Sequence, residues 1–270
     1  MQVIAKRPKS LSDLNFTYCP GCTHGISHRL IAEAVDELDM RNKMMGVAPV
    51  GCSVFAYKFF NFDMAEAAHG RAPAVATGMK RARPDMHVFT YQGDGDLAAI
   101  GTAEIVHAAN RGESMSVFFV NNAIYGMTGG QMSPTTPMGD FATTAPYGGM
   151  ENNFNISGLT IAAGASFVAR STVYHAVNLS KIIQRAIEKN GFSLVEVMSP
   201  CPTAYGKINK KGNGKKMILD QKHQAVKVEN AKDMPTEDLQ GKIVTGILVD
   251  RELPEYINTY DKIISQARRR

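Results

Sequence analysis

Two short stretches contain the residues whose types and spacing could bind a charged cofactor. Residues 93–96 read Gly-Asp-Gly-Asp and follow an apolar run typical of a buried strand. Residues 121–126 read Asn-Asn-Ala-Ile-Tyr-Gly and follow a second such run. A glycine turn at the end of a buried strand lets backbone N–H groups approach a phosphate, and the N-terminus of the next helix favours anions.

The carboxylates in the first stretch indicate a cation as well as a phosphate. Asp94 and Asp96 would repel a bare phosphate, so a divalent cation would have to balance the charge. Mg²⁺ prefers oxygen ligands, and a carboxylate, an asparagine side chain and a backbone carbonyl meet that demand. Alternatively, Gly-Asp-Gly-Asp is an ordinary turn, because glycine and aspartate are common turn residues. The asparagine pair after the next strand favours a metal-diphosphate site.

The four cysteines form a second chemical pattern. Cys19 and Cys22 flank a Pro-Gly pair, which predicts a tight turn that presents both sulfurs to one metal centre. Cys52 and Cys201 each follow a predicted strand, at the edge where ligands gather in open α/β sheets. On residue types alone, the four could bind a [4Fe–4S] cluster or a structural zinc ion, or remain unligated thiols.

Alternating helical and strand-like segments must position these residues. Strand patterns are predicted at 44–50, 86–92, 115–120, 166–170 and 192–198. Helical periodicity is predicted at 26–38, 73–83, 98–110, 155–164 and 177–189. The short links between these segments predict an α/β fold with a doubly wound parallel sheet. Residues 128–150 are rich in Gly, Thr, Pro and Ser, and a loop of this length is usually functional.

The sequence divides into three regions. Residues 1–17 are polar and irregular, which indicates an N-terminal arm. Residues 18–205 contain the alternating pattern and all four cysteines, so they are expected to form the binding domain. Residues 206–270 begin with a Lys/Gly/Asn-rich segment and end in a helical pattern at 256–267, which indicates a peripheral C-terminal extension.

The composition excludes several classes of protein. The chain has 270 residues with 44% hydrophobic and 20% charged, an ordinary soluble profile. Its net charge of +5 comes without a nucleic-acid recognition motif. No apolar run is long enough for a membrane span, and no secretory signal follows the basic residues near the N-terminus. We therefore expect a cytoplasmic protein, in which paired cysteines indicate metal or redox chemistry.

The motifs together carry a family resemblance. Gly93-Asp94-Gly95 followed by Asn121-Asn122 resembles the signature of thiamine diphosphate enzymes. The longer string at 121–131, Asn-Asn-Ala-Ile-Tyr-Gly-Met-Thr-Gly-Gly-Gln, resembles the β subunit of the 2-oxoacid:ferredoxin oxidoreductases, in the 2-oxoglutarate and 2-oxoisovalerate branch. The resemblance covers roughly residues 18–205 and implies the thiamine diphosphate-binding fold.

The resemblance implies three cofactors: thiamine diphosphate, Mg²⁺ and one [4Fe–4S] cluster. Mg²⁺ would be held by Asp94, by the Asn122 side chain and by the backbone carbonyl of Ile124. The cluster would be bound by Cys19, Cys22, Cys52 and Cys201. The residues expected around thiamine diphosphate are Gly51, Cys52, Ser53, His69, Arg71, Gly95, Asp96, Gly126, Met127 and Thr128. Of these, His69 and Arg71 are the expected catalytic side chains.

The implied reaction is the oxidative decarboxylation of a 2-oxoacid. Coenzyme A would take the acyl group, and electrons would pass through the cluster to ferredoxin. In this family the α subunit contributes the glutamate that drives the thiamine tautomer, so this chain alone is expected to be inactive. A γ subunit and sometimes a δ subunit usually complete the complex.

Two other functions remain open, together with the choice of substrate. One is a non-redox thiamine diphosphate-dependent decarboxylase subunit, which would need no set of four cysteines. The other is a zinc-stabilised assembly subunit without catalysis. The sequence also leaves open whether 2-oxoglutarate or 2-oxoisovalerate is the substrate.

Overall fold

The computed structural model describes residues 6–269 and is built on one central sheet. The sheet has eight strands in the order β2-β1-β3-β4-β6-β5-β8-β7. The strands are β1 (Met44–Ala48), β2 (Asp63–Glu66), β3 (His87–Gly93), β4 (Met115–Asn121), β5 (Phe167–Thr172), β6 (Phe192–Met198), β7 (Ala225–Lys227) and β8 (Ile243–Asp250). Neighbouring strands are parallel except for β5 and β8, which are antiparallel.

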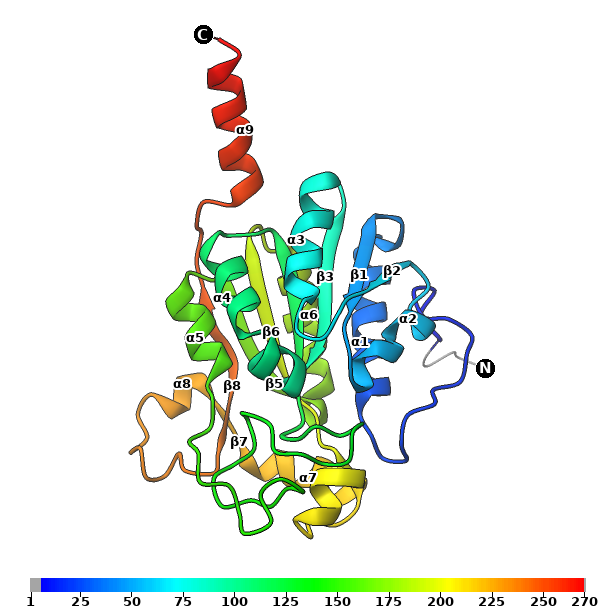
Figure 1. Ribbon diagram of the computed structural model, residues 1–270, viewed down its shortest axis with the longest axis vertical. Coiled ribbons are helices and arrows are strands. Elements are labelled where there is room, and N and C mark those ends of the chain that lie inside the picture. Colours follow the sequence, from blue (N-terminus) through cyan, green and yellow to red (C-terminus); the bar gives the residue numbers. More distant parts are fainter. Residues whose placement is uncertain (1–5, 270) are drawn as a thin grey trace.

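Helices cover both faces of this sheet (Figure 1). The α-helices are α1 (His24–Glu37), α2 (Ala56–Phe59), α3 (Ala72–Ala82), α4 (Thr102–Asn110), α5 (Ile156–Ala163), α6 (Ala176–Glu188), α7 (Gly214–Gln224), α8 (Val228–Ala231) and α9 (Tyr256–Ala267). Residues of α1 and α6 pack in one core cluster, and residues of α3, α4 and α5 pack in the other. The predicted doubly wound α/β sheet is therefore confirmed. None of the helices within residues 6–269 is both long and apolar enough to cross a membrane.

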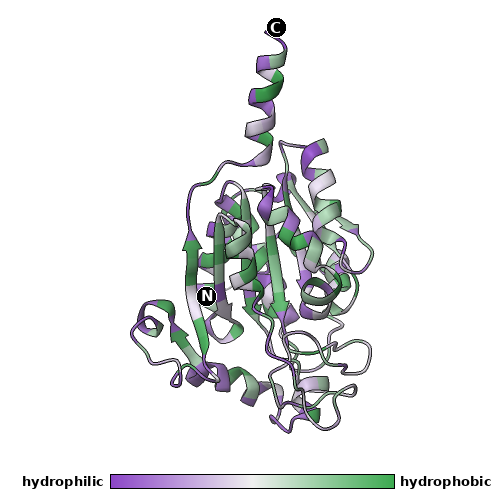
Figure 2. Ribbon diagram, turned by 60° about the vertical axis from the view of Figure 1, so that its left-hand side comes forward, coloured by the Kyte–Doolittle hydropathy of each residue, from purple (hydrophilic) through white to green (hydrophobic). Residues whose placement is uncertain are grey.

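The central strands are buried on both faces, which explains why their sequences are almost continuously apolar. Successive side chains of a strand point to opposite faces. Phe89, Tyr91 and Phe118 therefore pack on the α1–α6 side, whereas Val88 and Val117 pack on the α3–α4–α5 side. Figure 2 shows that apolar residues are concentrated in these strands.

The carboxyl ends of the parallel strands carry the loops with the sequence motifs. The chain order reverses between β1 and β3, where open α/β sheets form ligand-binding crevices. The loops after β1, β3, β4 and β6 all leave the sheet at this end. The long loop of residues 122–155 folds over the same end (Figure 1).

The structure differs from the sequence prediction mainly after residue 203. Residues 214–224 form α7, and β8 joins the central sheet beside β5, although neither was predicted. Strand β2 was also missed, because its residues are half-buried or exposed and show no apolar alternation. The helix predicted from residue 98 begins earlier, with one π-helical turn at Gly95–Ile100 that includes the second half of the Gly-Asp-Gly-Asp stretch.

Candidate active site

The turns after β3 and β4 touch each other at the carboxyl edge of the sheet. Tyr125 lies against Gly95, and its hydroxyl donates a 2.8 Å hydrogen bond to the Gly95 carbonyl. A Cβ atom at Gly95 would collide with the Tyr125 ring, so glycine is required beneath it. The two stretches singled out in the sequence therefore form one continuous structure.

Asp94 is buried at the end of β3, with 1% of its surface exposed. Ser133 Oγ and Thr135 Oγ1 donate hydrogen bonds of 2.6 and 2.7 Å to its Oδ2 atom. Burial raises the pKa of Asp94, and the two hydroxyl groups act in the opposite direction. Because these side-chain partners are neutral, a divalent cation would supply the positive charge that favours the ionised carboxylate. The donor set thus fits the expected Mg²⁺.

The two asparagines after β4 have different surroundings. Asn121 donates a 2.8 Å hydrogen bond from Nδ2 to Glu196. Asn122 remains on the turn, where its Oδ1 accepts a 3.2 Å hydrogen bond from the backbone N–H of Ile124. Ala123, which follows the two asparagines, has a left-handed φ of 64°, which is rare for a residue with a Cβ atom. Asn122 offers a neutral oxygen near the turn, and Asn121 anchors that turn to the sheet.

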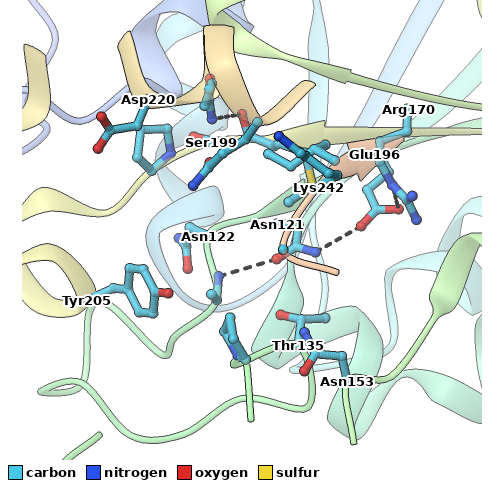
Figure 3. A pocket seen from close by; sticks show the side chains of 18 of the residues that line it. Asn121, Asn122, Thr135, Asn153, Arg170, Glu196, Ser199, Tyr205, Asp220 and Lys242 are labelled. Atoms are coloured by element: carbon cyan, nitrogen blue, oxygen red, sulfur yellow. Dashed lines mark hydrogen bonds and ion pairs between the residues drawn. The ribbon is translucent and has the colours of Figure 1, made fainter. Parts of the chain in front are cut away.

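A cavity of about 920 Å³ lies beside the asparagine turn (Figure 3). Its wall includes an ion pair of 2.7 Å between Arg170 Nε and Glu196 Oε2. Burial would raise the pKa of Glu196, but Arg170 and hydrogen bonds from Ser157 and Asn121 outweigh it and lower that pKa. Among the residues that the structure describes, Asn122 is the one predicted site residue that lines this cavity.

Asp96 faces the loop between β2 and α3. Its Oδ1 accepts a 2.6 Å hydrogen bond from the Gly70 N–H and lies 2.5 Å from His69 Nδ1. Its Oδ2 accepts a 2.6 Å hydrogen bond from Gln92 Nε2. Burial raises the pKa of Asp96, whereas the hydrogen bonds from Gln92 and Gly70 oppose this shift. Both carboxylate oxygens of Asp96 already accept hydrogen bonds from the protein. The predicted contact with the diphosphate would therefore be made by the backbone of Asp96.

The other residues predicted near thiamine lie around the same edge. Arg71 is half-exposed before α3 and forms an ion pair with Glu104 of α4. Gly51 has φ of 97° and leads into Cys52, while Ser53 is buried behind that turn. The two predicted residues that follow Gly126 are exposed: Met127 and Thr128.

The loop with Cys19 and Cys22 folds against the turn that follows Cys201. The Cys22 N–H donates a 3.0 Å hydrogen bond to the Cys19 carbonyl, closing the tight turn expected from Pro-Gly. Gly21 has φ of 79° within this turn, and a Cβ atom there would lie 3.5 Å from Pro202 Cγ. The first cysteine pair therefore adjoins the fourth cysteine.

Gly126 links the asparagine turn to the other thiols. A Cβ atom at Gly126 would lie 3.4 Å from Cys201 Sγ and 3.8 Å from Cys52 Sγ. Burial first, and then the neighbouring thiol groups, raise the pKa of Cys22 to about 11 and that of Cys52 to about 12. Cys19 and Cys201 contribute to both shifts. The contacts at Gly126 and at Gly21 thus bring the loops of all four cysteines into one region of the protein.

The arrangement of the thiols bears on the kind of metal centre they could hold. Among residues 6–269, no three side chains of His, Cys, Asp or Glu lie close enough together to bind one metal ion. Ligands of a single zinc ion would each lie about 2.3 Å from the metal. A four-iron cluster instead takes four thiolates distributed over its iron atoms. Four cysteines from three loops fit a cluster in kind and number.

Several residues around the site were not assigned from the sequence. Ser133 and Thr135 lie in the loop of residues 128–150 that was expected to be functional, but their hydrogen bonds to Asp94 were not predicted. Tyr125 lies inside the 121–131 motif, and Gln92 directly precedes the Gly-Asp-Gly-Asp stretch. The contacts of Ser133, Thr135 and Tyr125 join segments far apart in the chain, so the local sequence pattern does not predict them. Gln92, in contrast, contacts Asp96 only four positions away.

The fold and the paired turns define a class of enzyme. Residues 49–197 match the family described as "Thiamine pyrophosphate enzyme, C-terminal TPP binding domain". This match covers more than half of the chain, so the protein is a member of the thiamine diphosphate enzymes.

Similar proteins identify the branch of the thiamine diphosphate enzymes to which the chain belongs. The chain is 43% identical over 252 residues to the 2-oxoglutarate synthase subunit KorB of Methanocaldococcus jannaschii, covering 93% of each chain. It is 42% identical to the ketoisovalerate oxidoreductase subunit VorA of Methanothermobacter marburgensis, over 82% of this chain and 48% of that one. A solved 2-oxoglutarate:ferredoxin oxidoreductase from Magnetococcus marinus has a TM-score of 0.85 at 31% identity, covering 98% of this chain and 91% of that one. The chain belongs to the family of 2-oxoacid:ferredoxin oxidoreductase subunits.

Proposed function

We propose that this chain is the thiamine diphosphate- and cluster-binding β subunit of a 2-oxoacid:ferredoxin oxidoreductase. One observation carries the proposal: a single turn touches both halves of the site. Tyr125 covers Gly95 of the diphosphate turn, and the adjacent Gly126 lies against the sulfurs of Cys52 and Cys201. A cofactor on one side of this turn and a cluster on the other would be direct neighbours, as electron transfer between them requires.

The overall reaction follows from this pairing. A 2-oxoacid, coenzyme A and two oxidised ferredoxins would give acyl-coenzyme A, CO₂, a proton and two reduced ferredoxins. Bound thiamine diphosphate supplies the electron sink for decarboxylation, and the protein supplies position and electrostatics. Asp94, the Asn122 side chain and the Ile124 carbonyl would hold Mg²⁺. The residues bordering the diphosphate would be Gly95, Asp96, Gly126, Met127 and Thr128.

The chain would work only within a complex. Its relatives are named as subunits, and the solved relative is described with 2-oxoglutarate, coenzyme A and succinyl-CoA bound. We propose an α subunit that completes the thiamine site, γ or δ subunits beside it, and ferredoxin as the electron acceptor. A cytoplasmic location stays a prediction from the sequence.

Metal analysis of the full chain, purified without oxygen, tests the cluster. We expect about four iron and four sulfide per chain, with a visible absorbance that dithionite bleaches. Cys52→Ser and Cys201→Ser should lose most of the iron. Ser199→Ala, on the same turn as Cys201, is the matched control and should retain it. Zinc without iron in the wild-type chain would overturn the redox proposal.

Activity of the reconstituted complex tests the reaction and its substrate class. Reduction of ferredoxin would be followed with 2-oxoglutarate, 2-oxoisovalerate or pyruvate, each with and without coenzyme A. We expect reduction with one of the first two substrates and none without coenzyme A. Release of CO₂ without any reduction of ferredoxin would identify a non-redox decarboxylase instead.

A further inference from the structure

A buried chain of hydrogen bonds runs from the middle of β3 to His69. Thr90 Oγ1 donates to Gln92 Oε1 at 2.9 Å, and Gln92 Nε2 donates to Asp96 Oδ2 at 2.6 Å. Asp96 Oδ1 accepts from the Gly70 N–H at 2.6 Å and lies 2.5 Å from His69 Nδ1. Thr90 and Gln92 are 0% exposed and Asp96 is 2% exposed, so water does not compete for these contacts.

The chemistry of the groups determines the direction of each hydrogen bond. The Thr90 hydroxyl donates to the Gln92 carbonyl oxygen, which leaves the amide NH₂ of Gln92 to face Asp96. The Gly70 N–H can only donate. The carboxylate thus receives an N–H at each oxygen, an arrangement that stabilises its ionised form. An ionised carboxylate can only accept, so the hydrogen between Asp96 and His69 lies on Nδ1.

The same carboxylate also holds the backbone that carries the ring. Gly70 has φ of 78°, and a Cβ atom there would lie 2.7 Å from the Gly101 nitrogen. The loop is therefore packed directly on the start of α4 at a position that requires glycine. His69 retains 30% exposure of its side chain, so its ring extends from this anchored base to the surface of the chain.

We propose that Asp96 is a positioning residue that holds His69 in its Nδ1–H tautomer. Nε2 is then unprotonated and accepts a proton or a hydrogen bond from a group in the cofactor cleft, whereas in the other tautomer it could only donate. The inference rests on the proposed function, with His69 among the residues around thiamine diphosphate, as the family resemblance implies. It gives the Asp96 side chain a role separate from the diphosphate contact expected from the sequence.

Nitrogen NMR of the full chain labelled with ¹⁵N-histidine determines the tautomer of His69. This measurement needs neither a bound cofactor nor an activity assay. The His69 signals are identified by their loss in His69→Gln. In the wild type we expect a protonated Nδ1 and an unprotonated Nε2 for His69. Asp96→Ala removes the acceptor and should abolish this preference. Asp85→Asn, which changes an exposed carboxylate, is the matched control and should retain it. A wild-type His69 with its hydrogen on Nε2 would overturn the proposal, whether or not the variant folds.

Kinetics of the reconstituted complex separate positioning from cofactor binding. We expect Asp96→Ala to lower kcat by at least about 100-fold, the contribution typical of general acid–base groups, with the affinity for thiamine diphosphate within about threefold of the wild type. A large loss of affinity with kcat retained at saturating cofactor would show a diphosphate contact and contradict the proposal. If the chain instead binds no thiamine diphosphate in any form, the proposed function fails, while the NMR result still reports on Asp96.

Discussion

At the scale of single residues, Asp94 and Asp96 stand two positions apart in different surroundings. Asp94 is bound by the neutral hydroxyls of Ser133 and Thr135, so its charge has no cationic partner among them. Asp96 accepts N–H groups at both carboxylate oxygens. We therefore infer that Asp94 is the metal ligand of the pair and that Asp96 supports the protein around it.

Asp94→Asn should weaken the binding of thiamine diphosphate with Mg²⁺ by about 100-fold. The amide keeps the size of the carboxylate but loses the charge, and a charge-assisted contact is worth up to about 3 kcal/mol. Titration calorimetry of the complex with thiamine diphosphate in excess MgCl₂ measures the effect. Asp85→Asn, on the exposed surface, should leave the affinity unchanged. Equal affinities for both variants would refute the assignment of Asp94.

Gly95→Ala should destabilise the fold by about 1–3 kcal/mol, because its methyl group collides with the Tyr125 ring. Urea unfolding of the full chain measures this change. Gly78→Ala is the matched control: it lies in α3 with open space around it, and should stabilise the chain by up to about 1 kcal/mol. Adding Tyr125→Ala should relieve the clash, and a Gly95→Ala chain as stable as the wild type would disprove the close approach.

At the scale of elements, a buried ion pair joins β5 to β6 and supports the asparagine turn. Arg170→Met would leave the Glu196 carboxylate buried without its cation, and we expect a loss of about 3–5 kcal/mol in unfolding free energy at neutral pH. Arg185→Met is the matched control, because Arg185 is 59% exposed in its pair with Asp250 and should cost less than about 1 kcal/mol. Similar losses of unfolding free energy for both variants would mean that the burial of the Arg170–Glu196 pair does not increase its contribution to stability.

The pH dependence of this ion pair has a defined sign. The folded-state pKa of Glu196 is lowered, so the unfolded chain binds its proton more tightly than the folded chain does. The stabilisation is therefore present above the ordinary glutamate pKa of about 4.3 and is lost as the pH falls through the lower folded value. Without Arg170, burial raises the pKa of Glu196 in the variant, so the difference in unfolding free energy between wild type and Arg170→Met should begin to shrink above pH 4 and should continue to shrink below it. Urea unfolding of both proteins across this pH range measures the difference in unfolding free energy. A difference that does not change with pH would contradict the prediction.

At the scale of the whole molecule, α9 stands apart from the rest of the chain (Figure 1). It follows β8, which runs antiparallel to β5, so it leaves the sheet at the end away from the candidate site. No residue of α9 within the described chain is buried. Its start is held by Tyr256, whose ring lies 3.6 Å from the Arg81 guanidinium, and by the Glu255 cap.

Removal of residues 260–270 should therefore leave the folded body intact. We expect a change in melting temperature within about 2 °C, because no residue of the described part of this segment is buried and it therefore contributes little to the hydrophobic stabilisation. Differential scanning calorimetry measures this change, and the iron content of the truncated chain should equal that of the full chain. A loss of more than about 5 °C would show that α9 packs on the body in solution.

The predictability of the fold differed between its regions for a physical reason. The run at 115–121 was recognisable as a strand because it is buried on both faces and almost every side chain is apolar. Residues 243–250 were not assigned, because most side chains of β8 are half-buried and its partner β5 is distant in sequence. Strand β8 lies between β5 and the three-residue edge strand β7. Half-buried strands carry a weaker hydrophobic pattern than strands that are buried on both faces.

The sequence by itself determined the short-range features: the glycine turns, the asparagine pair, the cysteine spacing and the central strands. These features depend on residues that are neighbours in the chain, and the same pattern of residues indicated the family. Only the tertiary structure decided that the Asp96 side chain meets His69, and that Gly126 lies against Cys52 and Cys201. Those contacts join separate loops, and their geometry exists only once the strands have packed and brought their carboxyl ends together.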